Sequence, residues 1–487
     1  MPRALEPRRR FPPERPAAPG AECSDTRSAA PPFDPAARFA RALLGSLGLE
    51  IELPAHRDAT SPALDWALSG AMALTGEADG PPRFACGPLA SAARAAGMAL
   101  EALAPARGFG SLDAPALLGE RAALFGFSRR GAVSCGGSAH LLPARDGALV
   151  VNLPREADWH LLEAWLEVDL PNREETRDWS AVARSLATRD AEPLVLRGRE
   201  IGLAVAPALR TPAPPTVPFH LELESRAPAS AQRAERRPRV LDLSTLWAGP
   251  LAGSLLATAG FSVLKVESPQ RPDGARQGER AFFDLLNADK QASALDLTRA
   301  REREIFARLL ESADIVLESA RPRALAQLGF DARAWVSARP GRLWASITGY
   351  GREHEWIAFG DDAAVAAGLS FDPGPAPSPA RFCGDAIADP LTGLTAAVAI
   401  AALHAQGRGG LLSLSLVDVA AHAAAREDSE MAARLTLPIE RRPDGWSVHD
   451  GSAWRAIAEP RARTPHGRGP DLLAPEAALI EHWTRAC

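Results

Sequence analysis

Asp389 is the residue whose type and setting best suit covalent chemistry. It precedes Pro390 and a long apolar stretch, residues 390–406, that predicts a helix. The positive end of a helix dipole stabilises an ionised carboxylate, and backbone N–H groups orient it. A nucleophilic carboxylate needs both conditions. Aspartate followed by proline is also an ordinary helix start, so the residues alone leave a purely structural role open.

The turn of residues 244–250 is a second candidate, because it joins an expected strand to an expected helix. Ala248 and Gly249 are small enough for a ligand to approach the backbone, and free N–H groups at a helix start suit a phosphate. A dinucleotide site would need GxGxxG here and an acid about 20 residues further on. Glu267 meets the second condition, but the glycine pattern is absent, which argues against a dehydrogenase.

Strands and helices alternate from residue 239 onward. Short apolar runs typical of buried strands are separated by helical stretches, which predicts parallel βαβ units. We therefore expect an α/β protein with a parallel, Rossmann-like sheet that binds ligands at the carboxyl ends of its strands. The expected strands are residues 239–243, 261–266, 292–297, 314–318, 343–348 and 411–416.

Composition divides the chain into five parts. Residues 1–34 are rich in Pro and Arg and predict a disordered tail. Residues 35–205 predict a helix-rich globular region with a short strand section, and residues 206–238 a Pro-rich linker. Residues 239–425 form the expected sheet domain, and residues 426–487 a segment that wraps the surface.

The bulk properties exclude several classes of function. The chain has 487 residues and a net charge of -5, which gives no basic face for nucleic acid. We find no run of about 18 apolar residues to span a membrane. The five cysteines lack CxxC spacing, which argues against a disulfide framework and a zinc site. We therefore expect a cytoplasmic protein without a metal.

Lysine is rare in this chain, whose 55 basic residues include only Lys265 and Lys290 as lysines. A coding bias that replaces Lys by Arg wherever the exchange is harmless explains the rest. Because a compact ammonium and a planar guanidinium are not equivalent, these two positions either survive by chance or need an ammonium.

Five blocks of sequence occur in the order found in one known family. They are VLDLSTLWAGPLAGSLLATAGFSVLKVESP, LNADKQASALDL, ADIVLESARPRALAQLGF, LWASITGYG and ADPLTGLTAAVAIAALHAQGRGG. They resemble the family III CoA-transferases (CaiB/BaiF type), the group of formyl-CoA transferase, carnitine-CoA transferase and α-methylacyl-CoA racemase. The resemblance implies that fold, a Rossmann-like domain with a smaller α+β domain.

The resemblance also implies a function. Asp389 matches the family's catalytic aspartate, which attacks an acyl-CoA and then carries CoA as an aspartyl thioester until a carboxylic acid accepts it. Coenzyme A would contact Leu246, Trp247 and Ala248 in the first turn, and Lys290 would face a CoA phosphate or a nearby carbonyl. Ser268 stands where formyl-CoA transferase has a phosphate-binding arginine, which puts part of the nucleotide contact in doubt.

The first half of the chain resembles a different part of the same family. ACGPLASAARAAGMALEALA resembles the catalytic helix, with Pro88 where the aspartate belongs, so this copy is expected to be inactive. Gly136 and Gly137 match the glycine loop that closes over the acyl site, although they also suit a plain hairpin turn. Family members are interlocked homodimers, so we expect either a homodimer or a fused pseudo-dimer within one chain.

The choice between transfer and racemisation depends on the triplet that includes Asp361 and Asp362. The racemase has Gly-His-Asp here, and loss of the imidazole removes its natural base. Asp362 matches the acid that the family retains and would position substrate. Transfer of CoA is therefore the leading hypothesis; racemisation or isomerisation of an acyl-CoA, and a degenerate protein that only binds acyl-CoA, are the alternatives.

Overall fold

The computed structural model describes residues 34–54, 60–168, 177–210, 217–228, 236–321, 323–373, 378–425, 429–473 and 477–484. Its largest sheet has seven strands in the order β4-β10-β9-β8-β5-β6-β7, and only β4 runs antiparallel to its neighbour. The strands are β4 (His220–Arg226), β10 (Arg408–Ser415), β9 (Leu343–Thr348), β8 (Ile315–Glu318), β5 (Arg239–Leu243), β6 (Ser262–Glu267) and β7 (Gln291–Ala294). The expected parallel, Rossmann-like sheet is confirmed.

The order of the strands fixes where ligands can bind. From β5 the chain first builds outward through β6 and β7, and then returns to the other side of β5 to add β8, β9 and β10. The direction therefore reverses between β5 and β8. In open α/β sheets the crevice at such a switch point, beyond the carboxyl ends of the strands, is the usual binding site.

Both faces of the large sheet are covered, which explains why its strands are apolar throughout. Val240 and Leu241 point to opposite faces and belong to different cores. Helices α9 (Ala248–Thr258) and α15 (Ala388–Ala405) cover one face, and α11 (Ala300–Ser312), α13 (Ala332–Ala338) and α18 (Ala477–Thr484) contribute to the core on the other.

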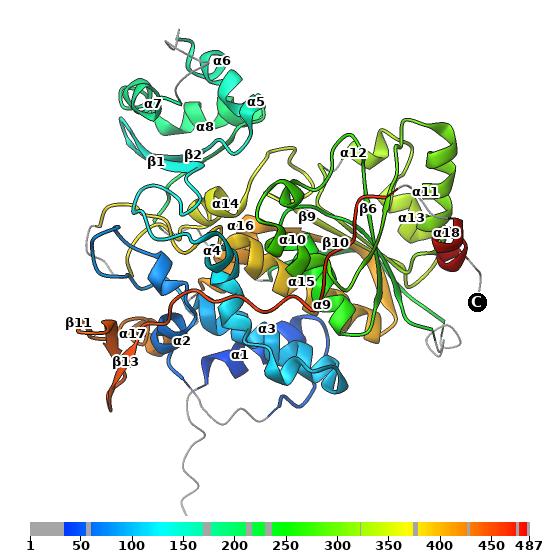
Figure 1. The fold of residues 1–487 in the computed structure, drawn as a ribbon, viewed down its shortest axis with the longest axis horizontal. Coiled ribbons are helices and arrows are strands. Elements are labelled where there is room, and N and C mark those ends of the chain that lie inside the picture. Colours follow the sequence, from blue (N-terminus) through cyan, green and yellow to red (C-terminus); the bar gives the residue numbers. More distant parts are fainter. Residues whose placement is uncertain are drawn as a thin grey trace, which may run out of the picture. The chain divides into compact units, whose positions relative to one another are not determined.

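A smaller α+β domain, also expected, has a core of its own. Its antiparallel sheet consists of β1 (Ala139–Ala144), β2 (Gly147–Asn152) and β3 (Ala204–Pro207). Helices α5 to α8 gather beside this sheet (Figure 1) and pack against it through buried residues such as Trp165 and Leu186. The helices are α5 (Glu156–His160), α6 (Leu162–Leu166), α7 (Trp179–Leu186) and α8 (Ala191–Glu200).

The N-terminal helices share the core of the large domain. Leu100 of α3 lies in the same core as Leu403 of α15, and α3 packs directly along α15. The sequence predicts one separate globular region for residues 35–205. The shared core contradicts this prediction. The helices concerned are α1 (Pro35–Ser46), α2 (Pro62–Leu68), α3 (Leu89–Leu103) and α4 (Glu120–Phe125).

The rest of the chain completes the surface. The segment after β13 hydrogen-bonds to Ala67 near α2 and then to Ala294 at the end of β7, so it crosses from one half of the chain to the other. The remaining elements are α10 (Arg280–Asn287), α12 (Arg323–Ala326), α14 (Gly360–Ala366), α16 (Leu416–Ala423), α17 (Ser429–Ala433), β11 (Ile439–Arg442), β12 (Gly445–His449) and β13 (Trp454–Ala456).

Two sequence predictions need correction. The range 206–238, expected as a linker, contains β4, which pairs with β10 along the edge of the large sheet. Its charged residues follow from that edge position, because one side of an edge strand faces water. The second correction concerns the statement that the sequence has no apolar run of about 18 residues. Helix α15 is long and apolar enough to cross a membrane by length and composition, but 78% of it is buried in the protein. It is apolar all round because it is packed on all sides.

The shared core leads to a prediction about stability. We expect Leu100→Ala to cost about 2–5 kcal/mol, because it leaves a cavity between α3 and α15. Hydrogen exchange followed by mass spectrometry should show faster exchange in both helices. Leu186→Ala, in the separate core of the small domain, is the matched control and should affect only that domain. Faster exchange confined to α3 in Leu100→Ala would contradict the shared core.

Candidate active site

A cleft of about 250 Å³ lies at the carboxyl ends of β5, β8 and β9, at the switch point of the sheet. The turns after these three strands supply most of its walls, and Asp389 of α15 reaches it from below the turn after β5. The small domain contributes Arg155. The lining residues used below are Leu246, Ala248, Gly249, Arg321, His354 and Glu355.

The turn after β5 is strained and tightly packed. Leu246 has a φ of 69°, in the left-handed region that side chains other than glycine rarely adopt, and its N–H donates to Asp273 Oδ1 at 2.8 Å. A Cβ on Gly249 would overlap Ser244, so only glycine fits there. Strain of this kind persists where the surroundings enforce it, and it is common at functional sites.

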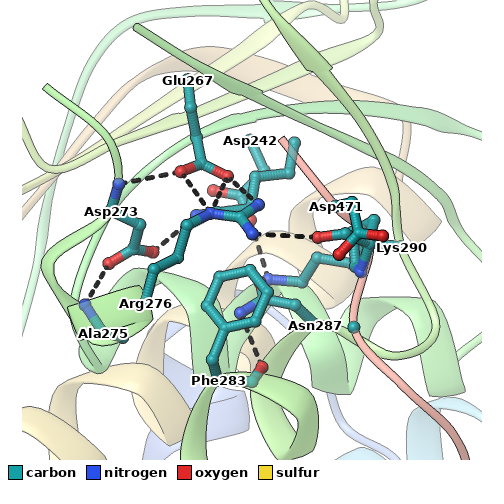
Figure 2. A network of polar contacts seen from close by, with 12 residues as sticks. Asp242, Glu267, Asp273, Ala275, Arg276, Phe283, Asn287, Lys290 and Asp471 are labelled. Carbon is teal, nitrogen blue, oxygen red and sulfur yellow. Dashed lines mark hydrogen bonds and ion pairs between the residues drawn. The ribbon is translucent and has the colours of Figure 1, made fainter. Parts of the chain in front are cut away.

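Two buried lysines hold this turn from beneath. Lys265 donates to the Ser244 carbonyl at 2.7 Å and pairs with Asp273 at 2.8 Å. Burial works to lower the pKa of Lys265, but the charges of Asp273 and Asp242 outweigh it and raise the pKa. Figure 2 shows the neighbouring network, in which Asp273 accepts from Ala275 and donates its own N–H to Glu267.

Lys290 forms the second buried pair, with Asp242 at 2.8 Å, and also donates to the Pro250 carbonyl at 2.8 Å (Figure 2). Both side chains are fully enclosed, and burial lowers the pKa of Lys290 to about 8. In this structure its ammonium cannot reach a ligand phosphate, which disagrees with that part of the prediction. A Cβ on Gly253 would lie 2.9 Å from both Asp242 Oδ2 and Lys290 Nζ, so glycine is required beside this pair.

Asp389 is the second residue of α15, and Ile387 is the N-cap. Asp389 therefore does not cap the helix, the structural role that the sequence alone left open, and it lines the cleft instead. The preceding turn contains Ala386 at a φ of 43°, whose N–H donates to Asp361 Oδ1 at 2.9 Å. A Cβ on Gly360 would overlap both the Ala386 carbonyl and the Asp389 carboxylate, so glycine is required beside the reactive group.

Three carboxylates and one guanidinium surround this helix start. Arg121 of α4 binds Asp385 through two hydrogen bonds, from Nε at 2.8 Å and from Nη2 at 2.5 Å. Burial raises the pKa of Asp389 to about 6, while the charge of Arg121 lowers it. Burial and the charge of Asp385 raise the pKa of Asp361 to about 7, again against Arg121. Asp389 and Asp361 therefore both change their protonation state close to neutral pH.

Of the three residues in the turn that were predicted to contact CoA, two line the cleft and one is buried. Leu246, 41% exposed, and Ala248 line the cleft. Trp247 is buried under the turn instead, with its ring 5.3 Å from the Arg121 guanidinium carbon and 5.5 Å from the Phe282 ring. Its position supports the carboxylate cluster from the protein side and does not bring it to a ligand in the cleft.

Asp362, Gly136 and Gly137 also lie outside the cleft lining. Asp362 is fully buried, where it accepts from Asn152 Nδ2 at 2.8 Å and from the Phe359 N–H at 3.0 Å. It thereby joins β2 of the small domain to the start of α14. Gly137 has a φ of 81° and closes a turn by donating to the Ser134 carbonyl at 2.9 Å, and Gly136 lies beside the Arg121 side chain.

Sequence reasoning missed four charged residues of this region. Arg121, Arg155, Arg321 and Asp385 are each ordinary in their local sequence, and 53 of the 55 basic residues are arginines, so no single arginine was conspicuous. The one available signal was the spacing of Asp385 and Asp389, which are four residues apart at an expected helix start. Within the described ranges, no group of three or more His, Cys, Asp or Glu residues could hold a metal.

The second half of the chain is similar to known proteins. Residues 238–443 match the model of CoA-transferase family III. The succinate–glutarate CoA-transferase of Agrobacterium fabrum is 30% identical over 204 residues, which cover 37% of this chain and 50% of that enzyme. The formyl-CoA:oxalate CoA-transferase of Escherichia coli is 27% identical over 194 residues, 37% of this chain and 47% of that enzyme. The chain thus spans about half the length of these relatives.

Two solved structures are similar to part of the chain. A CaiB/BaiF family protein from Brucella suis matches 43% of this chain and 64% of its own, with a TM-score of 0.39 and 24% identity. A Mycobacterium tuberculosis protein matches 44% of this chain and 65% of its own, with a TM-score of 0.37 and 26% identity.

The crowding around Gly360 gives a prediction for this site. We expect Gly360→Ala to destabilise the protein by about 1–3 kcal/mol, because the added methyl must displace Asp389 or the Ala386 carbonyl. Urea unfolding measures the change. Gly45→Ala in α1, where no atom lies within 4 Å, is the control and should stabilise by at most about 1 kcal/mol. Equal effects of the two substitutions would contradict this account of the turn.

Proposed function

We propose that this chain, whose residues 238–443 belong to CoA-transferase family III, moves CoA from an acyl-CoA thioester to a carboxylic acid, with Asp389 as the nucleophile. The observation that carries the proposal is that Asp389 lines the cleft from the N-terminal turn of a buried helix. A nucleophile needs access to its substrate, and a carboxylate held inside protein is less hydrated and hence more reactive toward a carbonyl than one in water.

The proposed reaction conserves charge and needs no external oxidant or base. The Asp389 carboxylate attacks the thioester carbonyl, the carbon–sulfur bond breaks, and CoA leaves as a thiolate. Asp389 is then joined to the first acid in a mixed anhydride. The thiolate attacks the aspartyl carbonyl and releases the first acid, which leaves CoA bound to Asp389 as a thioester. An acceptor carboxylate then attacks this thioester, and the returning thiolate forms the new acyl-CoA and frees Asp389. Covalent catalysis of this kind divides one difficult exchange into easier steps.

The walls of the cleft support the binding of CoA. Leu246 and Ala248 let the pantetheine arm lie along the backbone, and Gly249 leaves space beside them. Arg155 and Arg321 line the same cleft and can pair with phosphate. Trp247 and Lys290 are proposed to act indirectly, by holding the turn. Gly136 is proposed to act by packing beside Arg121, and Gly137 by closing the turn that carries Gly136.

Transfer is better supported than racemisation. Asp361 occupies the place of the racemase histidine in the sequence, yet it is buried, accepts from the Ala386 N–H and does not line the cleft. An α-proton exchange would need a base in contact with the substrate. Asp362 is likewise enclosed, so we propose that it positions the small domain and thereby the substrate.

The substrates are proposed from chemistry and from the relatives. The names of those relatives pair CoA with succinate, glutarate and oxalate, so a small carboxylic acid is the proposed acceptor here. A cytoplasmic location and a homodimer or intramolecular pseudo-dimer remain part of the proposal.

The covalent intermediate is directly testable. Incubation with an acyl-CoA such as succinyl-CoA, followed by hydroxylamine, should convert Asp389 to its hydroxamate, which peptide mass spectrometry detects. We expect Asp389→Asn to abolish the adduct and to lower the transfer rate by about 10³-fold or more, since the neutral amide is no nucleophile. A panel of acyl-CoAs that binds without any adduct would point to a non-catalytic acyl-CoA binder. Deuterium wash-in at Cα without an acceptor acid would favour racemisation.

The pH dependence follows from the state of the nucleophile. The pKa of Asp389, raised to about 6, means that the reactive carboxylate is lost by protonation as the pH falls through 6. We therefore expect kcat/KM to fall about tenfold per pH unit below about 6 and to level off above about 7. A profile that stays flat down to about pH 4.5 would contradict an enclosed nucleophile.

A further inference from the structure

The N-terminal half of the chain reaches the nucleophile through Arg121. This residue lies on α4, some 260 positions before Asp385, yet the two side chains form a bidentate pair. Other contacts hold the same two segments together: Thr75 accepts from the Gly384 N–H at 2.8 Å, and Cys135 contacts the Gly384 carbonyl at 3.4 Å. The loop that leads into α15 is therefore fixed by residues of the half that carries no nucleophile of its own.

The pairing of Arg121 leaves a charge imbalance. Asp385 is fully buried and Asp361 is 6% exposed. The charge of Asp385 raises the pKa of Asp389, and the charge of Asp389 in turn raises the pKa of Asp361. Arg121 is the cation that acts on all three, and these carboxylates in turn raise its own pKa. Its guanidinium also lies over the rings of Trp247, at 5.3 Å, and Phe127, at 5.8 Å. These contacts fix its plane.

The charged groups that act on Asp389 come from three segments: Arg121 from α4, Asp361 from α14 and Asp385 from the loop before α15. The Cys135 thiol lies near Asp385, Asp361 and Arg121. Burial raises the pKa of Cys135, so it remains a neutral thiol. On the open side, Arg155, Arg321, His354 and Glu355 line the cleft, and Arg155 is already paired with Asp158.

We propose that Arg121 is a positioning residue for the nucleophile: its guanidinium offsets the repulsion among the three carboxylates and thereby keeps Asp389 ionised and aimed into the cleft. The inference rests on the proposed function only for the role of Asp389; the electrostatic claim itself concerns the unliganded protein. Because Arg121 comes from the same chain, the two halves together complete one site, and the half with Pro88 contributes a charge in place of a second nucleophile.

Two substitutions with opposite expected effects test this role. Arg121→Gln removes the cation and should move the midpoint of the Asp389 titration upward by about one pH unit or more. Asp385→Asn removes a competing anion and releases Arg121 toward the remaining carboxylates, so it should move the midpoint downward. Arg121→Lys keeps the charge and should restore most of the wild-type midpoint.

The titration is measured without substrate. ¹³C NMR of the full chain labelled with [4-¹³C]aspartate, with the Asp389 signal assigned by Asp389→Asn, reports its midpoint directly. Arg129→Gln is the matched control, because Arg129 follows α4 on the same segment and, among the described residues, donates to the carbonyls of Glu77, Ala73 and Gly80 and to no carboxylate. It should leave the midpoint unchanged. General loosening of the fold cannot explain shifts of opposite sign in Arg121→Gln and Asp385→Asn.

The outcomes separate this inference from the proposed function. Opposite shifts together with a trapped Asp389 adduct support both. Opposite shifts without an adduct from any acyl-CoA support the role of Arg121 and overturn the nucleophile. If an adduct forms but Arg121→Gln leaves the Asp389 midpoint unchanged, the role of Arg121 is overturned. An equal shift of the midpoint in Arg121→Gln and in the control Arg129→Gln overturns it as well. In active protein, the acid limb of kcat/KM should move with the NMR midpoint, so a midpoint raised by one pH unit lowers kcat/KM of Arg121→Gln at pH 6 by about fivefold against wild type.

Discussion

The cost of enclosing negative charge constrains the rest of this structure. A carboxylate without counter-charge inside a protein takes up a proton, and a protonated aspartic acid is a poor nucleophile. Here three carboxylates crowd one helix start, and the arginine that offsets them is donated from the other half of the chain. The close packing of α3 on α15 contributes to this charge balance, because it keeps α4, which carries Arg121, near that helix start.

A second set of buried charges supports the opposite wall of the cleft. Lys265 and Lys290 sit beneath the turn after β5 and bind its carbonyls, while Asp273 holds the strained Leu246 N–H. Satisfied networks of this kind are rigid, because breaking any member leaves a buried charge unpaired. The turn can therefore keep a conformation that its own residues would not choose, with its backbone open to the cleft.

Local patterns in the sequence predicted the sheet and the helix that carries Asp389, because both depend on short-range periodicity and turn residues. The small α+β domain was predicted only through the resemblance to a known family. The sequence also marked the two lysines, although the structure assigns them to the support of the turn and not to a ligand. Arg121 and Asp385 could not be foreseen: their pairing joins positions 264 residues apart, and nothing local distinguishes either residue. The strand β4 was missed for a related reason, since an edge strand with charged residues looks like a linker until its partner is known.

The central claim is that Asp389 meets a thioester in the cleft at the switch point of the sheet. A crystal structure of the chain with a non-hydrolysable acyl-CoA analogue tests it most directly. The account predicts pantetheine along the turn after β5, with the carbonyl carbon about 3–3.5 Å from a carboxylate oxygen of Asp389. An analogue bound elsewhere, or bound in this cleft with Asp389 turned away from its carbonyl, would contradict the account.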